Sequence, residues 1–250
     1  MSALNLVGLP VDLAALHRLA ERRELVRHGI LDEGLILHHL MGETFGPGAA
    51  QPFRMLPARG GRTGTLYAYT PHDPADLKDM AATVATPEAQ TVLRLPEIQS
   101  RPLPDQLFSE GRTLGFDILF RPVVRAHAGA GSRYAGAERD AFQAKAERAF
   151  PERRGEMARE GDSRETVYID WLQDRLGDAA EILRDQTRLA YFQRRRVLRG
   201  GRVIEGPDAV FHGTLRVGDE ARFRDCLAKG VGRHRAYGYG MLLLRPPQRC

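Results

Sequence analysis

The sequence contains one glycine-rich segment with a high density of positive charge, Gly230-Val-Gly-Arg-His-Arg-Ala-Tyr-Gly-Tyr-Gly240, which leads into the apolar run Met241-Leu-Leu-Leu-Arg245. Its glycines allow positive φ angles or a close approach to a partner, and Arg233, His234 and Arg235 place positive charge among them. Such a loop suits a phosphate backbone, although standing alone it also fits an ordinary turn. The Gly-Lys-Ser/Thr ending of a nucleoside-triphosphate loop is absent and a strand follows, so ATP is a poor candidate ligand.

The N-terminal half alternates strand-like and helix-like segments. Residues 3–9 are apolar and are closed by Pro10, which predicts a strand, and Asp12 is placed to cap the helix that follows. Asp32 is placed to cap a second helix, which runs to about Phe45. Further strands are predicted at 52–56, 64–70 and 91–95, with a helix at 73–84. The resulting order of strand, helix, strand, strand, helix, strand is the ferredoxin-like one.

The C-terminal half fits the same order with an interruption. Strands are predicted at 111–122, 180–183, 189–192, 210–217 and 241–244, and helices at 167–176 and 219–229. The charged segment 129–162 is predicted to be an excursion with helical stretches around 138–149 and a turn at 151. The halves share no residue-level repeat. We therefore expect an α+β protein of two tandem ferredoxin-like (RRM-like) βαββαβ domains, 1–108 and 109–250, with a helical insertion in the second.

The composition is that of a globular protein with a modest excess of positive charge. The 250 residues carry a formal net charge of +5, and nearly all basic side chains other than histidine are arginine. Arginine suits bidentate phosphate contacts, so an acidic partner is favoured, although genome composition produces the same bias. Two cysteines fit a reducing cytoplasm and make no metal set, and no run resembles a signal or a membrane span. We expect a cytoplasmic protein with no membrane association.

Two further basic clusters are candidates for RNA contact. Arg194, Arg195 and Arg196 precede Gly200-Gly201, which predicts a basic hairpin tip. On the first helix, Arg18 and Arg22 lie one turn apart. These two side chains form either an RNA-facing ridge or the solvated face of an amphipathic helix.

His38 and His39 lie on the two edges of the apolar face of the second helix, and periodicity does not distinguish between them. A histidine at such an edge is either a packed, hydrogen-bonded residue or an acid–base catalyst. The sequence shows no paired carboxylates, no Cys/His nucleophile set and no clustered metal ligands, so we expect neither a metal nor another cofactor. RNA cleavage remains open to such a chain because the substrate supplies its own nucleophile, the 2′-hydroxyl.

Four segments together resemble the CRISPR repeat-cleaving endoribonucleases of the type I-E Cascade complex, in the repeat-associated mysterious protein superfamily. They are Leu37-His38 with Phe45 and the strand after it, Gly111-x-x-Leu-x-Phe-x-Ile with Pro122, Asp170-Trp-Leu-Gln-Asp-Arg-Leu-Gly177, and Val210-Phe-His-Gly-Thr-Leu with the terminal glycine-rich segment. The segments occur in order and span most of the chain. The resemblance implies two ferredoxin-like domains, metal-independent cleavage of precursor CRISPR RNA 3′ of a repeat hairpin, and a 2′,3′-cyclic phosphate product.

The resemblance also implies partners and site residues. The enzyme is expected to keep the repeat hairpin, to join other Cascade subunits, and to meet target DNA only indirectly through that complex. The family's general acid/base histidine falls on His38, with His39 as the fallback, and Arg233, His234 and Arg235 fall on the loop that contacts phosphate. The family's tyrosine one turn before the histidine is replaced here by Leu35.

Two alternatives stay open at the level of the sequence. One is a non-catalytic subunit that holds hairpin RNA within a ribonucleoprotein, which the leucine at position 35 favours. The other lies outside RNA biology and is a ferredoxin-like protein that binds a small ligand. Salt-dependent affinity for a hairpin separates the RNA readings from the small-ligand one.

Overall fold

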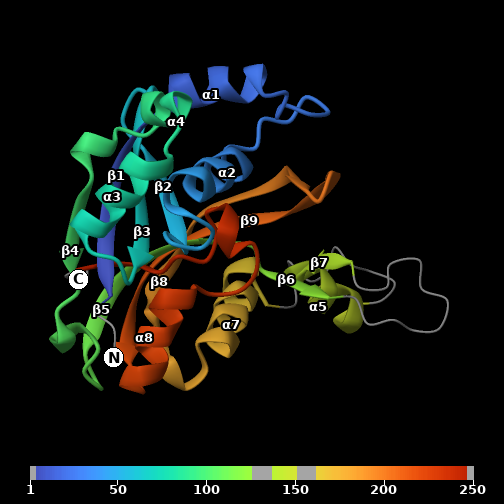
Figure 1. Ribbon diagram of the computed structural model, residues 1–250. Coiled ribbons are helices and arrows are strands. Elements are labelled where there is room, and N and C mark those ends of the chain that lie inside the picture. Colours follow the sequence, from blue (N-terminus) through green and yellow to red (C-terminus); the bar gives the residue numbers. More distant parts are fainter. Residues whose placement is uncertain (1–3, 126–136, 151–161, 247–250) are drawn as a thin grey trace.

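The computed structural model describes residues 4–125, 137–150 and 162–246. The strands of these ranges form two four-stranded sheets and one two-stranded sheet (Figure 1). The first large sheet is built from strands of the N-terminal half and the second from strands of the C-terminal half. The chain's halves therefore form one sheet each.

The first sheet has the strand order β2-β3-β1-β4 and is antiparallel throughout. Its strands are β1 (Asn5–Asp12), β2 (Phe53–Pro57), β3 (Thr63–Thr70) and β4 (Gln99–Pro102). Its helices are α1 (Leu13–Arg22), α2 (Glu33–Phe45), α3 (Pro74–Val84) and α4 (Pro87–Val92). This strand order is that of a ferredoxin-like fold with one additional helix before β2 and one before β4.

The predicted strand at 91–95 is wrong, because α4 ends at Val92 and a short 3-10 turn, η1 (Leu95–Glu97), begins at Leu95. Thr86 caps α4 by accepting a hydrogen bond from the Ala89 amide at 3.1 Å. The fourth strand is the proline-containing stretch that follows. Proline has no N–H group to donate. Pro102 is tolerated because β4 is an edge strand, and no strand of the described ranges lies on its outer side to accept a hydrogen bond.

Asp12 and Asp32 cap α1 and α2 as predicted, each accepting a hydrogen bond from a first-turn amide. The two helices and the sheet share a core whose fully buried members include Leu9, Leu16 and Leu37. The Asp32 cap fixes the residue at which α2 begins, and the shared core fixes how the helix packs on the sheet. This placement matters because α2 carries both candidate catalytic histidines.

The second large sheet has the equivalent order β10-β5-β9-β8. Its strands are β5 (Thr113–Phe120), β8 (Ala180–Arg199), β9 (Arg202–Val217) and β10 (Leu243–Arg245), and its helices are α7 (Arg164–Leu176) and α8 (Glu220–Lys229). The closing strand thus begins two residues later than predicted. The α+β class with two ferredoxin-like units is confirmed, whereas the boundary between residues 108 and 109 stays a prediction.

The strands predicted at 180–183 and 189–192 are one long strand, β8, which two register irregularities interrupt. Such bulges break the alternation of side chains, so the pattern reads as two short strands. The predicted hairpin is present and turns at Gly200-Gly201 with positive φ, whereas Arg194–Arg196 pair with β9 and so lie on the strand before the turn. The β8–β9 hairpin projects beyond its sheet and runs beside α2 (Figure 1).

The described part of the charged segment forms β7 (Glu138–Asp140), which pairs with β6 (Val123–Arg125), and α5 (Ala141–Ala149). The predicted helical stretch around 138–149 is therefore confirmed for α5, and the predicted turn at 151 lies outside the described residues. Buried Asp140 accepts hydrogen bonds from Tyr168 Oη and Arg164 Nη1, both at 2.8 Å. These contacts attach the insertion to α7.

Among the described residues, no helix has the length and apolar character needed to cross a membrane.

Candidate active site

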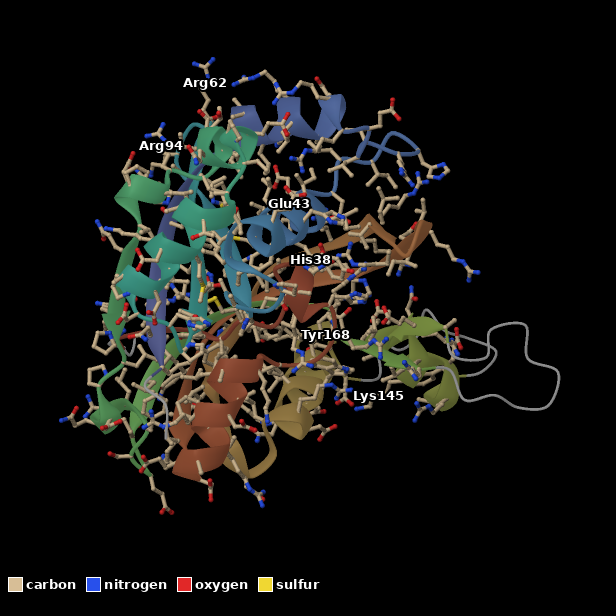
Figure 2. All side chains as sticks on the ribbon, viewed as in Figure 1. His38, Glu43, Arg62, Arg94, Lys145 and Tyr168 are labelled. Carbon is tan, nitrogen blue, oxygen red and sulfur yellow. The ribbon has the colours of Figure 1, made fainter. Side chains whose placement is uncertain are left out.

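His38 lies on α2 and faces a cavity of about 290 Å³ formed by both halves of the chain. The cavity is also lined by Leu35 and His39 from α2, by Gly200 and Gly201 at the hairpin tip, and by Tyr237. Figure 2 shows the His38 side chain where α2 meets the C-terminal half. Although periodicity places the two histidines on different edges of α2, both side chains reach the same cavity. His38 is half-buried and His39 is exposed.

The His38 ring is held by an aromatic neighbour from the far end of the sequence. Its centroid lies 4.9 Å from that of Tyr237 and 5.6 Å from that of His39. Burial lowers the pKa of His38, and the positive charges of His39 and Arg199 lower it further. The imidazole is therefore neutral at neutral pH and able to accept a proton.

His38 differs from three other histidines in having no carboxylate beside it within the part of the chain that the structure describes. His17 contacts Glu33 at 2.7 Å, His212 contacts Asp117 at 2.9 Å, and His234 contacts Glu138 at 2.8 Å. The Nδ1 atom of His38 is covered from solvent and has no hydrogen-bond partner among the described residues. Of these four rings, His38 is the one that lines the cavity between the two halves.

The glycine-rich loop packs directly on α2 through the short 3-10 turn η5 (Arg235–Tyr237). A Cβ atom at Gly34 would lie 2.4 Å from the carbonyl oxygen of Tyr237, far inside van der Waals contact. At the other end of the loop, a Cβ at Gly240 would lie 2.1 Å from the Val231 oxygen. Glycine at position 34 therefore permits the approach that brings Tyr237 against His38.

The basic side chains of the loop have different surroundings. Arg233 and His234 both contact the carboxylate of Glu138 on β7, whereas exposed Arg235 donates to the Lys229 carbonyl at 2.9 Å. Burial would raise the pKa of Glu138, but its hydrogen bonds to His234 and Arg233 outweigh burial and lower it to about 2. The inserted β7 strand thus fixes the loop through an ionised carboxylate.

A second open cavity of about 610 Å³ lies along this loop. Among the described residues that line it are Lys229, Arg233 and Arg235, and none of them is acidic. Tyr237 lines this cavity as well as the His38 cavity. The loop cavity therefore adjoins the His38 cavity at Tyr237. Arg233 and Lys229 pair with Glu138 and Asp225, and exposed Arg235 is left to meet a phosphate backbone.

Arg199 at the end of β8 links the hairpin to the histidine. Its guanidinium carbon lies 3.8 Å from the centroid of the Tyr237 ring, which is a cation–π contact. Buried Asp32 holds Arg199 through a 2.6 Å ion pair and also accepts from the Leu198 amide at 2.9 Å. The carboxylate that caps α2 therefore also anchors the hairpin tip beside His38.

The remaining predicted RNA contacts do not line the His38 cavity. Arg194 pairs with Glu205 at 2.8 Å, Arg195 lines a third cavity between the two halves, and Arg196 is exposed on the hairpin. Arg18 and Arg22 are exposed on α1 and line none of the three cavities around Tyr237. The structure thus brings together His38, the loop and the hairpin, and leaves the α1 arginines outside.

Sequence reasoning missed Tyr237, Arg199 and the second role of Asp32. Tyr237 stands within the glycine-rich segment, but its contact with His38 joins positions 199 residues apart in the sequence. Arg199 stands directly before the Gly200-Gly201 turn, and this position was the one sequence signal that it belongs to the hairpin tip. Within the described ranges, no group of three or more His, Cys, Asp or Glu side chains is arranged to hold a metal ion.

Solved structures resemble this fold over nearly the whole chain. Cse3 from Thermus thermophilus, bound to an RNA representing a pre-cleavage complex, is 18% identical, with a TM-score of 0.64 over 98% of this chain and 100% of that one. Cas6e from Escherichia coli K-12 is 17% identical, with a TM-score of 0.60 over 97% and 99%. A chain of a CRISPR RNA-guided surveillance complex in a pre-nicking state is 18% identical, with a TM-score of 0.56 over 97% and 99%.

At these identities the structural likeness establishes the fold. No curated protein sequence matches the chain significantly. The sequence model that describes CRISPR associated proteins matches residues 13–246, which include α2, the β8–β9 hairpin and the glycine-rich loop. The chain therefore belongs to the CRISPR-associated protein family.

Proposed function

We propose that this protein is a metal-independent endoribonuclease that cleaves precursor CRISPR RNA at the 3′ base of the repeat hairpin. It leaves a 2′,3′-cyclic phosphate, keeps the hairpin, and acts in the cytoplasm as a subunit of the Cascade interference complex. The observation that carries the proposal is His38, a neutral imidazole without a carboxylate partner in a cavity reached by a basic loop.

Similar proteins support the substrate class. Thermus thermophilus Cse3 has been captured with an RNA that represents a pre-cleavage complex, and another similar chain belongs to an RNA-guided surveillance complex. Both share nearly the full length of this chain. The same fold with a histidine at the end of a basic surface favours the same type of substrate here.

The reaction needs in-line geometry and two proton transfers. The 2′-oxygen attacks phosphorus, the bond to the 5′-oxygen breaks, and the products are a 2′,3′-cyclic phosphate and a 5′-hydroxyl end. Neutral His38 accepts the proton of the 2′-hydroxyl as the attack begins, and a proton must reach the leaving 5′-oxygen. Arg199 and Arg235 offset the negative charge that develops on the phosphate.

Tyr237 is placed to supply the help that the family's tyrosine gives from position 35. Leu35 lines the His38 cavity but offers only an apolar surface. The Tyr237 ring lies against His38 and beneath the Arg199 guanidinium, so it orders both groups. Its hydroxyl adds a hydrogen-bond donor for the scissile phosphate.

Variants of the two adjacent histidines test the assignment. We expect His38→Ala to slow single-turnover cleavage of a repeat hairpin RNA by about 100-fold or more, with hairpin affinity nearly unchanged. His39→Ala should retain most of the rate, and His28→Ala, an exposed position outside the His38 cavity, is the matched control. Undiminished cleavage by His38→Ala would refute the assignment.

The leucine at position 35 favours a second candidate, a subunit that binds the hairpin without cutting it. Under this alternative the same cavity holds the RNA backbone and His38 contributes only a hydrogen bond. The pure protein with repeat RNA in EDTA separates the two functions. A shifted band without product supports binding alone, and product formation supports the endoribonuclease.

A further inference from the structure

A third cavity of about 400 Å³ lies between the two halves and shares Tyr237 with the basic loop cavity. Its size falls within the range of about 300–1,000 Å³ that is usual for small-ligand sites. Tyr237 lines this cavity and the His38 cavity alike, so the two are neighbours. When an RNA phosphate lies at His38, the nucleotide next to that phosphate can therefore reach the third cavity.

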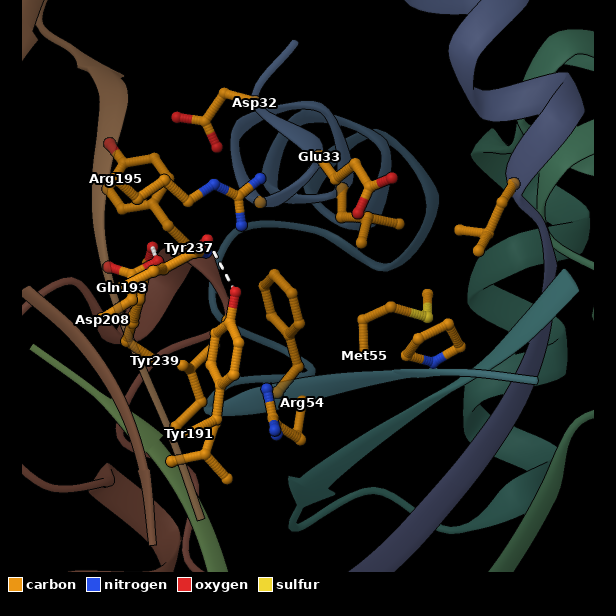
Figure 3. Close-up of a pocket in the computed structure, with 18 of the residues that line it drawn as sticks. Asp32, Glu33, Arg54, Met55, Tyr191, Gln193, Arg195, Asp208, Tyr237 and Tyr239 are labelled. Carbon is orange, nitrogen blue, oxygen red and sulfur yellow. Dashed lines mark hydrogen bonds between the residues drawn. The ribbon is translucent and has the colours of Figure 1, made fainter. Parts of the chain in front are cut away.

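The walls of this cavity combine aromatic and polar side chains from both halves. Figure 3 shows Arg195, Gln193 and Tyr191 of β8 on one side and Glu33 and Met55 on the other. Tyr191 is 51% exposed, which is unusual for a large aromatic side chain in this molecule. An exposed aromatic ring at the rim of a cavity is suited to stacking on a base.

The charges of the cavity are balanced, which argues against a phosphate as its occupant. Asp32 is already paired with Arg199, and Asp208 with Arg121 at 3.1 Å. Arg54 lies 3.6 Å from Asp117 and is committed to it. In the basic loop cavity, in contrast, the Arg235 guanidinium has no carboxylate partner within the described ranges.

The polar groups that remain can read the edge of a base. Tyr191 Oη donates to Gln193 Oε1 at 2.7 Å, which orients the amide and leaves its NH₂ group as a donor. The Arg195 guanidinium has no hydrogen-bond or ion-pair partner within the described ranges. Glu33, whose Oε1 contacts His17 Nε2 at 2.7 Å, keeps its second carboxylate oxygen as an acceptor on the opposite wall. Donors and an acceptor that face one another across an aromatic-rimmed space match the edge of a nucleobase.

We propose that this cavity binds one unpaired nucleobase of the RNA, that of the nucleotide immediately 3′ of the cut. The base stacks on Tyr191 and its edge meets Gln193, Arg195 and Glu33. The inference rests on the proposed function, because that function defines which nucleotide is unpaired next to the scissile phosphate. The site makes cleavage depend on a flanking nucleotide in addition to the hairpin.

The test compares repeat RNAs that differ only in single bases of the 3′ flank. All the RNAs carry a 2′-deoxy nucleotide at the cut, which removes the nucleophile, so affinity is measured on uncleaved RNA. For the wild type, an abasic site at the first flanking nucleotide should weaken binding by about tenfold, and one at the third should have no effect. Tyr191→Ala and Gln193→Ala should abolish the tenfold difference while binding the abasic RNA as the wild type does.

Gln90→Ala, an exposed change on α4, is the matched control and should keep the tenfold difference. Equal affinities of the wild type for intact and abasic RNAs would overturn the base site, whether or not the hairpin is cut. If the tenfold difference in affinity is observed but the all-ribose RNA is not cleaved, the proposed endoribonuclease activity is overturned and the base site remains supported. The two proposals therefore fail by different results.

Discussion

At the scale of the residue, the candidate site depends on a histidine that the fold leaves unpaired. His17, His212 and His234 each lie beside a carboxylate, and such a partner orients the ring. His38 instead has an aromatic ring and a nearby guanidinium as neighbours. Helical periodicity did not distinguish His38 from His39, and the resemblance to the family assigned the catalytic role to His38. The contacts that separate the two rings involve segments far apart in the sequence, such as Tyr237.

The neighbours of His38 set the pH dependence of cleavage. Burial and positive neighbours disfavour the protonated ring, so the pKa lies below its ordinary value of 6.5 and the neutral base is available above that lowered pKa. We predict that the single-turnover rate rises with pH and reaches its plateau with a midpoint below 6.5. Arg199→Gln removes one positive charge and should move the midpoint upward. An unchanged midpoint would show that Arg199 does not act on His38.

A buried ion pair within the C-terminal half lies behind the wall of the third cavity, which Asp208 lines. Arg121 and Asp208 are each 1% exposed and lie 3.1 Å apart, and Tyr239 Oη donates to Asp208 at 2.9 Å. Asp208→Ala leaves a guanidinium buried without its partner, so we predict a loss of about 3 to 5 kcal/mol in the free energy of unfolding.

Urea denaturation measures this loss, with Glu205→Ala as the control because its pair with Arg194 is solvent-exposed. The control should cost less than about 1 kcal/mol. Similar losses for the two variants would mean that the buried pair is no more important than an exposed one.

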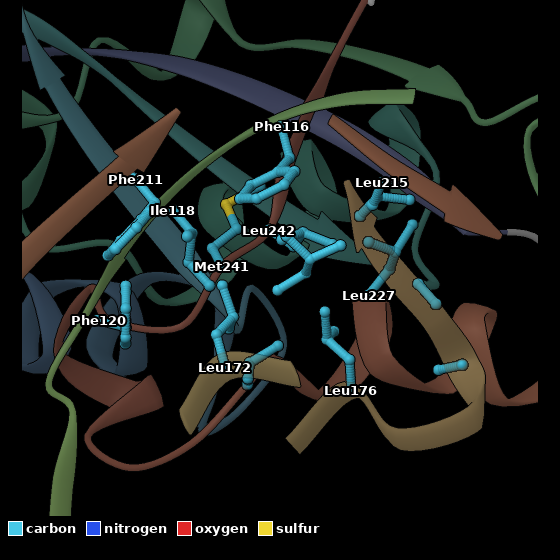
Figure 4. Close-up of a cluster of buried hydrophobic side chains, with 14 of the residues drawn as sticks. Phe116, Ile118, Phe120, Leu172, Leu176, Phe211, Leu215, Leu227, Met241 and Leu242 are labelled. Atoms are coloured by element: carbon cyan, nitrogen blue, oxygen red, sulfur yellow. The ribbon is translucent and has the colours of Figure 1, made fainter. Parts of the chain in front are cut away.

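At the scale of the element, the essential relationship is the packing of the glycine-rich loop on α2. The loop is anchored at its C-terminal end by Met241 and Leu242, whose side chains insert among Phe116, Phe120 and Leu172 (Figure 4). Its tip is held by Glu138 of the insertion. The strand-like run after the loop was visible in the sequence, whereas the anchor at Glu138 joins residues 96 positions apart and had no local signal.

Two glycines of α2 offer a matched test of this packing. A Cβ at Gly34 would collide with the Tyr237 backbone, but a Cβ at Gly42 meets nothing within 4 Å. We predict that Gly34→Ala displaces the loop, separates Tyr237 from His38 and reduces cleavage by about tenfold or more.

Gly42→Ala should leave cleavage unchanged and raise stability by about 0.5–1 kcal/mol, because alanine is favoured in a helix interior. Both variants are compared by single-turnover cleavage and thermal unfolding. If Gly34→Ala cleaves as fast as Gly42→Ala, the contact between α2 and the loop is not required for catalysis.

The errors of sequence-based assignment also belong to this scale. The stretch around Thr91 resembles a strand, but the Thr86 cap and Pro87 begin a helix, and the true fourth strand is a proline-containing edge. In β8, bulges hid the continuity of one strand. Both errors changed element bounds and left the order of elements intact, which is why the fold class was predicted correctly.

At the scale of the whole molecule, the candidate site is a joint product of the two ferredoxin-like units. The N-terminal unit supplies His38 and the Asp32 anchor, and the C-terminal unit supplies Arg199, Tyr237 and the basic loop. The order of elements was readable because each unit follows its own periodicity. How the units meet was not readable, because that contact consists of single residues far apart in the sequence.

The most direct test of the central claim is the chemistry of the RNA end. The wild-type protein is incubated with a synthetic repeat hairpin RNA in EDTA, and the fragment carrying the hairpin is analysed by mass spectrometry. We predict one cut at the 3′ base of the hairpin, a 2′,3′-cyclic phosphate one water lighter than the linear phosphate, and no cut in RNA with a 2′-deoxy nucleotide there. A 3′-hydroxyl end, or cleavage that requires an added divalent metal, would contradict the account.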